Sequence, residues 1–488
     1  KAGIPKEMLQ FVPCEDSIAE KMVKDQRVDM VVLTGATETA KLLQRLRPGI
    51  DLAAETGGKN AIIVTAMADR DLAVKEIVHS AFGFAGQKCS ACSLVVLEKE
   101  IYEDPQFKKQ LLDAAESLKT SSQWERDCRV NPLIQPPSGA LLRAVQSLDE
   151  GEEWILKPVI SEVNPRLLSP GIKWGVKPGS FMHQAELFGP VIGVLCADDL
   201  DHAISIVNST PYGLTTGLHS LDEREQVKWK EKIIAGNLYI NRGITGAIVE
   251  RQPFGGCKAS SFGRGLKAGG PNYLLQFMHV EQKCPPADLS KVPDALDAWA
   301  AHFTEEERAA FKTACGSYSY YFRHYFRHEH DPLKILGQDN LQYYRPREGL
   351  ILRVTDQDSD LEILCAAAAA FISGTPLEIS MPSPRPRLEK LPAMVEGERE
   401  FIEKIEKSSF PRVRFLNKPS EFLAIELARL GSAACREPLL FNGRVELLHF
   451  LREVSLSSDY HRYGNLGLRE QKMEKHGECC ELAECCGC

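Results

Sequence analysis

Long apolar runs and an excess of positive charge are both missing from this sequence of 488 residues. The apolar stretch that contains Cys365 to Ile372 is far shorter than the roughly 18–20 residues that a membrane-spanning helix needs. A formal net charge of −8 offers no basic surface to nucleic acid or to an acidic membrane. We therefore expect a small-molecule ligand, no nucleic-acid partner and no membrane span.

Regular cysteine spacing is missing too, although the chain contains 15 cysteines. Most of them are scattered singly, which is typical of reduced thiols in a cytoplasmic protein and not of a disulfide framework. The tail gathers several close together: His476, Cys479, Cys480, Cys485, Cys486 and Cys488. Zinc or copper(I) binding is one interpretation of this tail. Because adjacent cysteine pairs are not finger spacing, we predict a flexible, oxidisable terminus and no metal site.

Strand and helix patterns alternate through the first half of the chain, which predicts an α/β protein. Met30 to Leu33 is a short apolar run, and the following turn leads into a predicted helix that ends near Leu46, before a proline. A second predicted helix, from Asp69, has one apolar face formed by Val74, Ile77, Val78 and Ala81. The Cys89 turn follows the C-terminal end of this helix.

A second α/β pattern follows a predicted linker at residues 285–291. Predicted strands at 350–354, 377–380 and 413–415 alternate with predicted helices at 361–372 and 396–406. This alternation favours a second Rossmann-like module. We find no glycine-rich phosphate turn in it, so we predict a non-catalytic lid or assembly domain.

Two glycine-containing turns carry the residue types of a thiol acyl-transfer site. Cys89 lies in Gly83-Phe-Ala-Gly-Gln-Lys-Cys-Ser90, and Glu55 begins Glu-Thr-Gly-Gly-Lys-Asn60. A thiolate attacks a carbonyl carbon, and a carboxylate then activates water. Since a free thiol has a pKa near 8.5, the nucleophile needs nearby N–H groups or cations. The alternatives are a packed thiol, a Cys89-x-x-Cys92 redox or zinc pair, and a solvated loop glutamate.

Two further motifs complete a resemblance to the aldehyde dehydrogenase superfamily, which runs from about Lys1 to about Phe277. They are Glu186-Leu-Phe-Gly-Pro190 and Gln252-Pro-Phe-Gly-Gly256, in the family's order and spacing. The closing Lys267-Ala-Gly-Gly-Pro-Asn-Tyr273 resembles glutamate semialdehyde (1-pyrroline-5-carboxylate) dehydrogenases. The closest resemblance is to the dehydrogenase half of bifunctional proline utilisation A proteins.

The resemblance implies a role for each site residue. Cys89 is the nucleophile and supplies one oxyanion donor through its backbone N–H, and Glu55 is the base for thioester hydrolysis. The cofactor is NAD, held by Thr34, Gly35, Ala36, Gly57, Glu186 and Phe188. Within this set, Glu186 binds the nicotinamide ribose, Phe188 packs beside the nicotinamide ring, and the N–H groups of the Thr34–Ala36 turn receive the pyrophosphate. The substrate is bound by Ser90, Gly246, Ala247 and Phe254.

The resemblance also implies a domain plan. Residues 1–56 form the C-terminal part of an incomplete Rossmann-type cofactor domain, and residues 57–261 form the α/β catalytic domain. Residues 262–283 carry a tail strand for oligomer contacts, and residues 284–488 form the second Rossmann-like module. Because the family's oxyanion asparagine and adenine-ribose lysine lie upstream of Lys1, we expect a fragment of a longer, homo-oligomeric enzyme with a proline dehydrogenase domain upstream.

The predicted activity is NAD-dependent oxidation of L-glutamate γ-semialdehyde to L-glutamate, a step of proline breakdown. One alternative is an aldehyde dehydrogenase for another small aliphatic aldehyde. The other is an inactive scaffold, because half of the cofactor domain is missing and the second module shows no chemistry.

Overall fold

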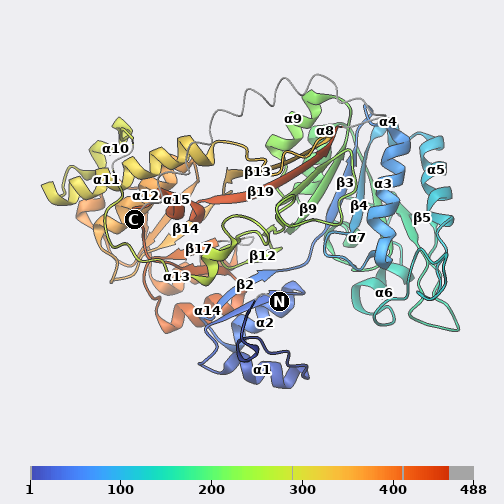
Figure 1. Cartoon of the computed structure of the whole chain (residues 1–488), viewed down its shortest axis with the longest axis horizontal. Helices are drawn as coiled ribbons and strands as arrows, with labels where there is room; N and C mark the ends of the chain where they lie inside the picture. Colours follow the sequence, from blue (N-terminus) through green and yellow to red (C-terminus); the bar gives the residue numbers. More distant parts are fainter. Residues whose placement is uncertain (1–2, 288–289, 409–411, 461–488) are drawn as a thin grey trace.

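The computed structural model describes residues 3–287, 290–408 and 412–460. Figure 1 shows a large sheet with its helices on the right, a second α/β region on the left, and a small sheet with α1 and α2 below them. The Cys-rich tail, for which we predicted a flexible terminus, lies outside the described residues. No helix in the described ranges is long and apolar enough to cross a bilayer.

The largest sheet has nine strands in the order β13-β19-β10-β9-β3-β4-β7-β6-β5. The bounds are β3 Asn60–Val64, β4 Cys92–Glu98, β5 Glu153–Leu156, β6 Gly171–Trp174, β7 Val191–Ala197, β9 Thr215–His219, β10 Asn237–Ile240, β13 Gln338–Pro346 and β19 Leu451–Asp459. Its central strands are parallel. Every residue of β3 and β9 is buried, as expected for parallel strands covered on both faces.

Helices flank this sheet, and one of them positions the cysteine turn. They are α3 Arg70–Phe82, α4 Lys99–Tyr102, α5 Pro105–Glu116, α6 Gly139–Gln146, α7 Phe181–Gln184, α8 Leu200–Asn208 and α9 Glu223–Lys232. Helix α3 starts at the N-cap Asp69, whose side chain accepts from the N–H of Leu72 at 3.1 Å. The predicted apolar face of this helix is confirmed, since all four of its named residues are buried.

A small sheet, β1-β2-β12, forms the N-terminal region. Its strands are β1 Met30–Thr34, β2 Asp51–Glu55 and β12 Ser261–Phe262, and its helices are α1 Asp16–Lys24 and α2 Thr37–Leu46. The predicted strand and the helix ending at Leu46 are confirmed. Strand β2 ends at Glu55 and pairs with both β1 and β12, which fixes the direction in which Glu55 leaves the sheet.

The second α/β module contains a five-stranded parallel sheet in the order β16-β15-β14-β17-β18. Its strands are β14 Leu350–Arg353, β15 Leu377–Met381, β16 Ala393–Val395, β17 Arg412–Phe415 and β18 Ala433–Arg436. Its main helices are α11 Glu305–Tyr321, α12 Asp360–Ser373, α13 Glu398–Glu406 and α14 Glu421–Leu430. The predicted second module is therefore present, with its own apolar core.

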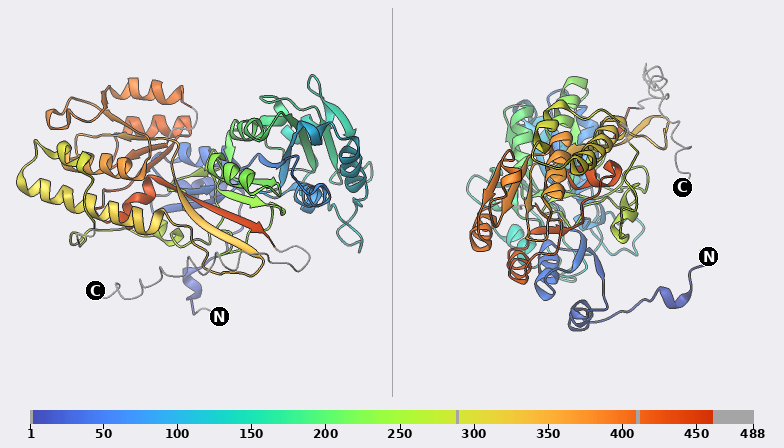
Figure 2. Two further views of the ribbon diagram at one scale, coloured as in Figure 1. Left: turned by 90° about the horizontal axis from the view of Figure 1, so that it is seen from above. Right: turned by 90° about the vertical axis from the view of Figure 1, so that its left-hand side faces the viewer.

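Two strands after residue 284 depart from the expected plan, because they belong to the sheet of the first region. Strand β19 pairs in parallel with β10 and antiparallel with β13, and Figure 2 shows both strands running from the second module towards that sheet. The described residues 262–283, where we expected a tail strand, contain the end of β12 at Phe262, an isolated β-bridge at Ala268 and the 3-10 helix Tyr273–Phe277, but no separate strand. Glycines and a proline interrupt this stretch, and proline cannot donate to a strand ladder.

Candidate active site

Cys89 lies in a strained turn directly after α3. Phe84, Ala85 and Gly86 have φ of 56°, 52° and 65°, a left-handed run that reverses the chain at the end of the helix. A Cβ on Gly86 would lie 2.4 Å from the carbonyl oxygen of Gly189, so only glycine permits this approach. The turn therefore packs directly against the loop that carries Glu186.

Asn60 clamps the backbone of this turn from the first position of β3. Its Nδ2 donates to the carbonyl oxygens of Cys89 at 2.7 Å and Ala91 at 2.9 Å, while its Oδ1 accepts from the N–H of Thr215 at 3.1 Å. Only 2% of Asn60 is exposed. A buried amide with its polar groups paired in this way holds the cysteine backbone rigidly.

Glu186 contacts the glycine pair that follows Glu55. Its Oε1 accepts from the N–H of Gly58 at 3.0 Å. A Cβ on Gly57 would lie only 2.0 Å from Glu186 Oε2, so the missing side chain makes room for this carboxylate. Burial raises the pKa of Glu186, while the Gly58 N–H and Lys59 lower it.

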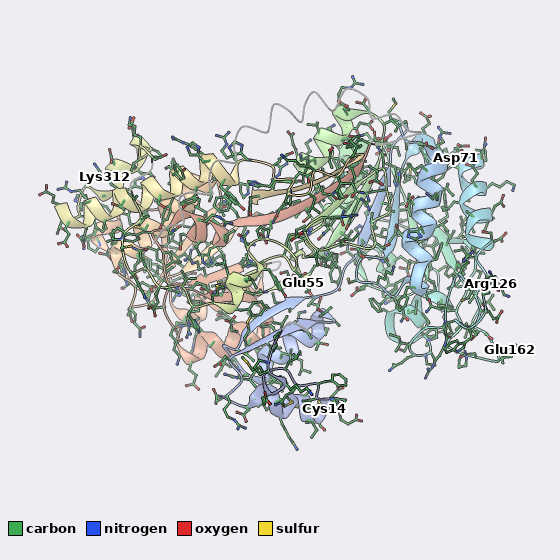
Figure 3. The ribbon with its side chains drawn as sticks, in the orientation of Figure 1. Cys14, Glu55, Asp71, Arg126, Glu162 and Lys312 are labelled. Atoms are coloured by element: carbon green, nitrogen blue, oxygen red, sulfur yellow. The ribbon has the colours of Figure 1, made fainter. Side chains whose placement is uncertain are left out.

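Glu55 extends from the end of β2 towards the Phe254–Gly256 turn. Its Oε2 accepts from the N–H of Gly256 at 3.1 Å, and Figure 3 places it where the small sheet meets the rest of the molecule. Burial raises the pKa of Glu55 to about 8, against the opposing effects of Lys267 and the Gly256 N–H. A carboxyl whose pKa lies near neutral pH suits general base catalysis.

The Cys89 thiol is influenced by both carboxylates. Burial is the largest cause that raises its pKa, and Glu55 and Glu186 raise it further. The backbone N–H groups of Ser90 and Cys89 act in the opposite direction. The structure thus brings together Cys89, Glu55 and Glu186 from three separate elements of the chain.

The predicted pyrophosphate turn lies beside Glu55 in the small sheet. Thr34 pairs with Glu55 in the ladder, and the N–H of Gly35 donates to the carbonyl oxygen of Glu55 at 3.2 Å. The Gly35 donor is therefore already in use. Helix α2 begins after Ala36 without a side-chain cap, which leaves its first N–H groups as the available donors.

Of the predicted substrate residues, Gly246, Ala247 and Phe254 lie in or at the end of the loop between β10 and the Phe254 turn, whereas Ser90 belongs to the cysteine turn. Ile244 anchors one end of the loop through the Ser80 hydroxyl at 3.1 Å, and Phe254 anchors the other through paired bonds with Ala268 at 2.9 and 2.8 Å. Gly246, with φ of 84°, is exposed, and Ala247 is half-buried. Ser90 is only 6% exposed. The loop is thus fixed at its ends and accessible at its tip.

Phe188 also has a left-handed backbone, with φ of 52°, and 43% of it is exposed. An exposed aromatic ring in this conformation is unusual. Phe188 lies two residues after Glu186, whose carboxylate contacts Gly58, so its backbone is close to this part of the site.

Sequence reasoning assigned no role to Asn60, Lys267 or Glu453. Asn60 ends the glycine turn motif, and Lys267 begins the Lys-Ala-Gly-Gly-Pro segment, so both had a local signal. Glu453 had none, because it lies in β19 and reaches the site only through the fold: its carboxylate accepts from the N–H of Lys267 at 2.7 Å.

Residues 1–282 match the family described as "Aldehyde dehydrogenase family". This match covers more than half of the chain, and the fold agrees with it, so the chain belongs to the aldehyde dehydrogenase family. The predicted fold class is confirmed.

Particular relatives point to one branch of this family. The chain is 34% identical over 295 residues to a 1-pyrroline-5-carboxylate dehydrogenase of Geobacillus thermodenitrificans, a match that covers 58% of this chain and 56% of the relative. The chain thus spans about half the length of the curated relatives it matches. Proline utilization A from Corynebacterium freiburgense superposes with a TM-score of 0.77 and 40% identity, over 91% of this chain and 43% of that one. A Thermus 1-pyrroline-5-carboxylate dehydrogenase with bound NAD superposes with a TM-score of 0.52 and 32% identity, over 57% and 55%.

Proposed function

We propose that this chain is the thiol-bearing part of an NAD-dependent dehydrogenase that oxidises L-glutamate γ-semialdehyde to L-glutamate in proline breakdown. The observation that carries the proposal is that Gly58, three residues after Glu55, lies against both Glu186 and the Cys89 turn: its N–H donates to Glu186 at 3.0 Å, and a Cβ on it would lie 3.0 Å from the carbonyl oxygen of Cys89. The similarity to 1-pyrroline-5-carboxylate dehydrogenases supports the choice of substrate.

Acylation begins with Cys89. The thiolate adds to the aldehyde carbon, and the C–S bond forms as the carbonyl oxygen becomes an oxyanion. Asn60 holds the backbone of Cys89 by a hydrogen bond to its carbonyl oxygen, which supports a role for the Cys89 N–H as a donor to that charge. When the oxyanion collapses, the hydride leaves and a thioester remains on Cys89.

Hydrolysis of the thioester requires Glu55. The carboxylate removes a proton from a water molecule, whose oxygen attacks the thioester carbon and displaces the Cys89 sulfur. With a pKa of about 8, Glu55 takes up this proton readily and returns it to solvent afterwards.

The residues present fit NAD, which accepts the hydride when bound. The carboxylate of Glu186 is held by Gly58 at one oxygen, and its other oxygen is available to the hydroxyls of a ribose. The start of α2 offers backbone donors to phosphate, and exposed Phe188 offers a ring face. Gly57 contributes the space that admits the Glu186 carboxylate.

The partners and location follow from the same relatives. We propose that a proline dehydrogenase domain precedes this chain in the native polypeptide, as similarity to bifunctional proline utilization A supports, and that the enzyme is homo-oligomeric. Free thiols throughout the described residues support a cytoplasmic location.

A comparison of substrates on the full native polypeptide tests the proposal. The kcat/KM for glutamate semialdehyde should exceed those for propanal and succinate semialdehyde by at least about tenfold, because only the first presents the matching carboxylate and chain length. Mass spectrometry should find an aldehyde-derived adduct on Cys89. Equal kcat/KM values would contradict the substrate, and an adduct-free Cys89 would favour the scaffold alternative.

A further inference from the structure

Lys267 is a buried lysine beside the site that has no role in the chemistry above. Only 1% of it is exposed. Its Nζ donates to the carbonyl oxygen of Gly236 at 2.8 Å, to Asn237 Oδ1 at 2.9 Å and to the carbonyl oxygen of Gly255 at 2.9 Å. Three acceptors require three N–H donors, which only the charged ammonium form of lysine provides.

Lys267 and Glu55 are hydrogen-bonded to opposite sides of the same peptide group. The carbonyl oxygen of Gly255 accepts from the lysine, and the N–H of Gly256, in the same peptide unit, donates to Glu55 Oε2 at 3.1 Å. A cation on the oxygen of a peptide group polarises it and strengthens its N–H as a donor. Through this polarised peptide group, the positive charge of Lys267 stabilises the negative charge of the Glu55 carboxylate.

Gly255 has no side chain, and this arrangement leaves little room for one. A Cβ at this position would lie 3.0 Å from Glu55 Oε1 and 3.2 Å from Lys267 Cγ. Its N–H donates to Asn237 Oδ1 at 3.2 Å, the same oxygen that accepts from Lys267. The turn is thereby held in one orientation, with its carbonyl towards the lysine and the next N–H towards the glutamate.

We propose that Lys267 is a positioning residue for the base Glu55, acting through the Gly255–Gly256 peptide. The inference rests on the proposed function, since it concerns hydrolysis of the Cys89 thioester. Lys267 transfers no proton in this role. It keeps the carboxylate of Glu55 oriented and favours its ionised form.

The charged and titratable groups that act on Glu55 and Lys267 come from several segments of the chain. Glu55 faces Lys267 and Glu453, and it acts in turn on Cys89. Burial lowers the pKa of Lys267 to about 7, and Arg452 lowers it further, whereas Glu55, Glu453 and Cys257 raise it. The three acceptors at its Nζ favour the charged form. Lys267 lowers the pKa of Glu55 and Glu453 raises it, whereas burial raises it most. Loss of the lysine charge therefore raises the pKa of Glu55 further.

The test is the pH dependence of thioester hydrolysis in Lys267→Met on the full native polypeptide. Rapid-mixing measurements separate the first burst of NADH, which reports acylation, from the steady state, which reports hydrolysis. We expect the burst to persist and the acid limb of the steady-state rate to move up by about 1–2 pH units. Below that limb the steady-state rate falls by about ten- to a hundredfold.

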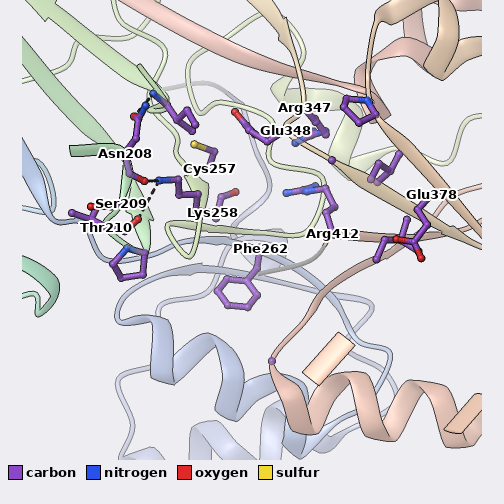
Figure 4. A pocket seen from close by; sticks show the side chains of 18 of the residues that line it. Asn208, Ser209, Thr210, Cys257, Lys258, Phe262, Arg347, Glu348, Glu378 and Arg412 are labelled. Atoms are coloured by element: carbon purple, nitrogen blue, oxygen red, sulfur yellow. Dashed lines mark hydrogen bonds between the residues drawn. The ribbon is translucent and has the colours of Figure 1, made fainter. Parts of the chain in front are cut away.

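Two control variants separate charge from structure. Lys258→Met removes another partly buried lysine, whose Nζ donates to the carbonyl oxygens of Asn208 at 2.6 Å and Thr210 at 3.1 Å (Figure 4). It should leave the limb in place. Asn237→Ala loosens the same turn without removing a charge, so it should slow the enzyme without moving the limb.

Each result decides the question. An unmoved limb in Lys267→Met, or an equal movement in Asn237→Ala, would overturn the inference. If Lys267→Met shows no NADH burst, Lys267→Gln is tested in its place. Loss of the burst in both variants, while Lys258→Met keeps its burst, would show a purely structural role for Lys267 and would also overturn the inference. If the unsubstituted polypeptide forms no NADH with the semialdehyde, the proposed function itself fails.

Discussion

Two buried pairs of charged side chains, one in each α/β region, are linked in different ways, although the first region also contains a direct buried pair, Lys173 and Glu152 at 2.9 Å. In the second module, Arg414 of β17 contacts Glu446 directly at 2.6 Å, with side chains 1% and 0% exposed. In the first region, Lys267 and Glu55 are joined only through a peptide group. A direct pair neutralises its charges and serves the fold, whereas a bridged pair leaves a carboxylate able to react.

The largest expected effect is on chemistry and comes from the thiol. Cys89→Ala should lower aldehyde oxidation by about 10⁴-fold or more, since no other group forms the thioester. Its stability should change by less than about 1 kcal/mol. Steady-state kinetics and thermal unfolding measure the two effects.

Cys92→Ala is the matched control for that change. Cys92 is 2% exposed and its Sγ contacts the carbonyl oxygen of Leu94 at 3.2 Å. Its removal should cost about 1 kcal/mol of stability and leave most of the activity. Equal loss of activity in both variants would favour a cysteine pair as the reactive group.

The next effect is on stability and comes from the second module. Glu446→Ala leaves Arg414 buried without its partner, so the free energy of unfolding should fall by about 3 kcal/mol. Chemical denaturation measures it. Glu426→Ala, which removes a partly exposed partner of the exposed Arg429 at 2.8 Å, should cost less than about 1 kcal/mol. Similar costs for both would contradict the larger structural contribution of the buried Arg414–Glu446 pair.

The last effect is a pH dependence of stability that Glu55 imposes. Its folded-state pKa of about 8 exceeds the ordinary value of 4.5, so the folded state holds this proton more tightly. The resulting stability is present below about pH 4.5 and is lost as the pH rises through about 8. Glu55→Gln should therefore gain about 3 kcal/mol over the parent protein as the pH rises from 5 to 8, because each unit of pKa difference corresponds to about 1.4 kcal/mol. A difference that is constant with pH would contradict the raised pKa.

The sequence predicted those elements whose structure is determined by residues close to one another in the chain. The α3 face and its cap, the β1–α2 unit and the strands of the second module all follow local periodicity. The glycine turns around Glu55 and Cys89 were visible because close backbone approach requires glycine. Placement of Glu453 beside Lys267, and of β13 and β19 in the first sheet, depends on pairing across long stretches of chain, which no local pattern encodes.

The position of β19 has a consequence for synthesis. This strand lies between β10 and β13, so β10 remains an uncovered edge until residues 451–459 emerge from the ribosome. An open edge of a parallel sheet attracts other chains. Some two hundred further residues are translated between β10 and β19, so the sheet can be closed at this position only late in synthesis.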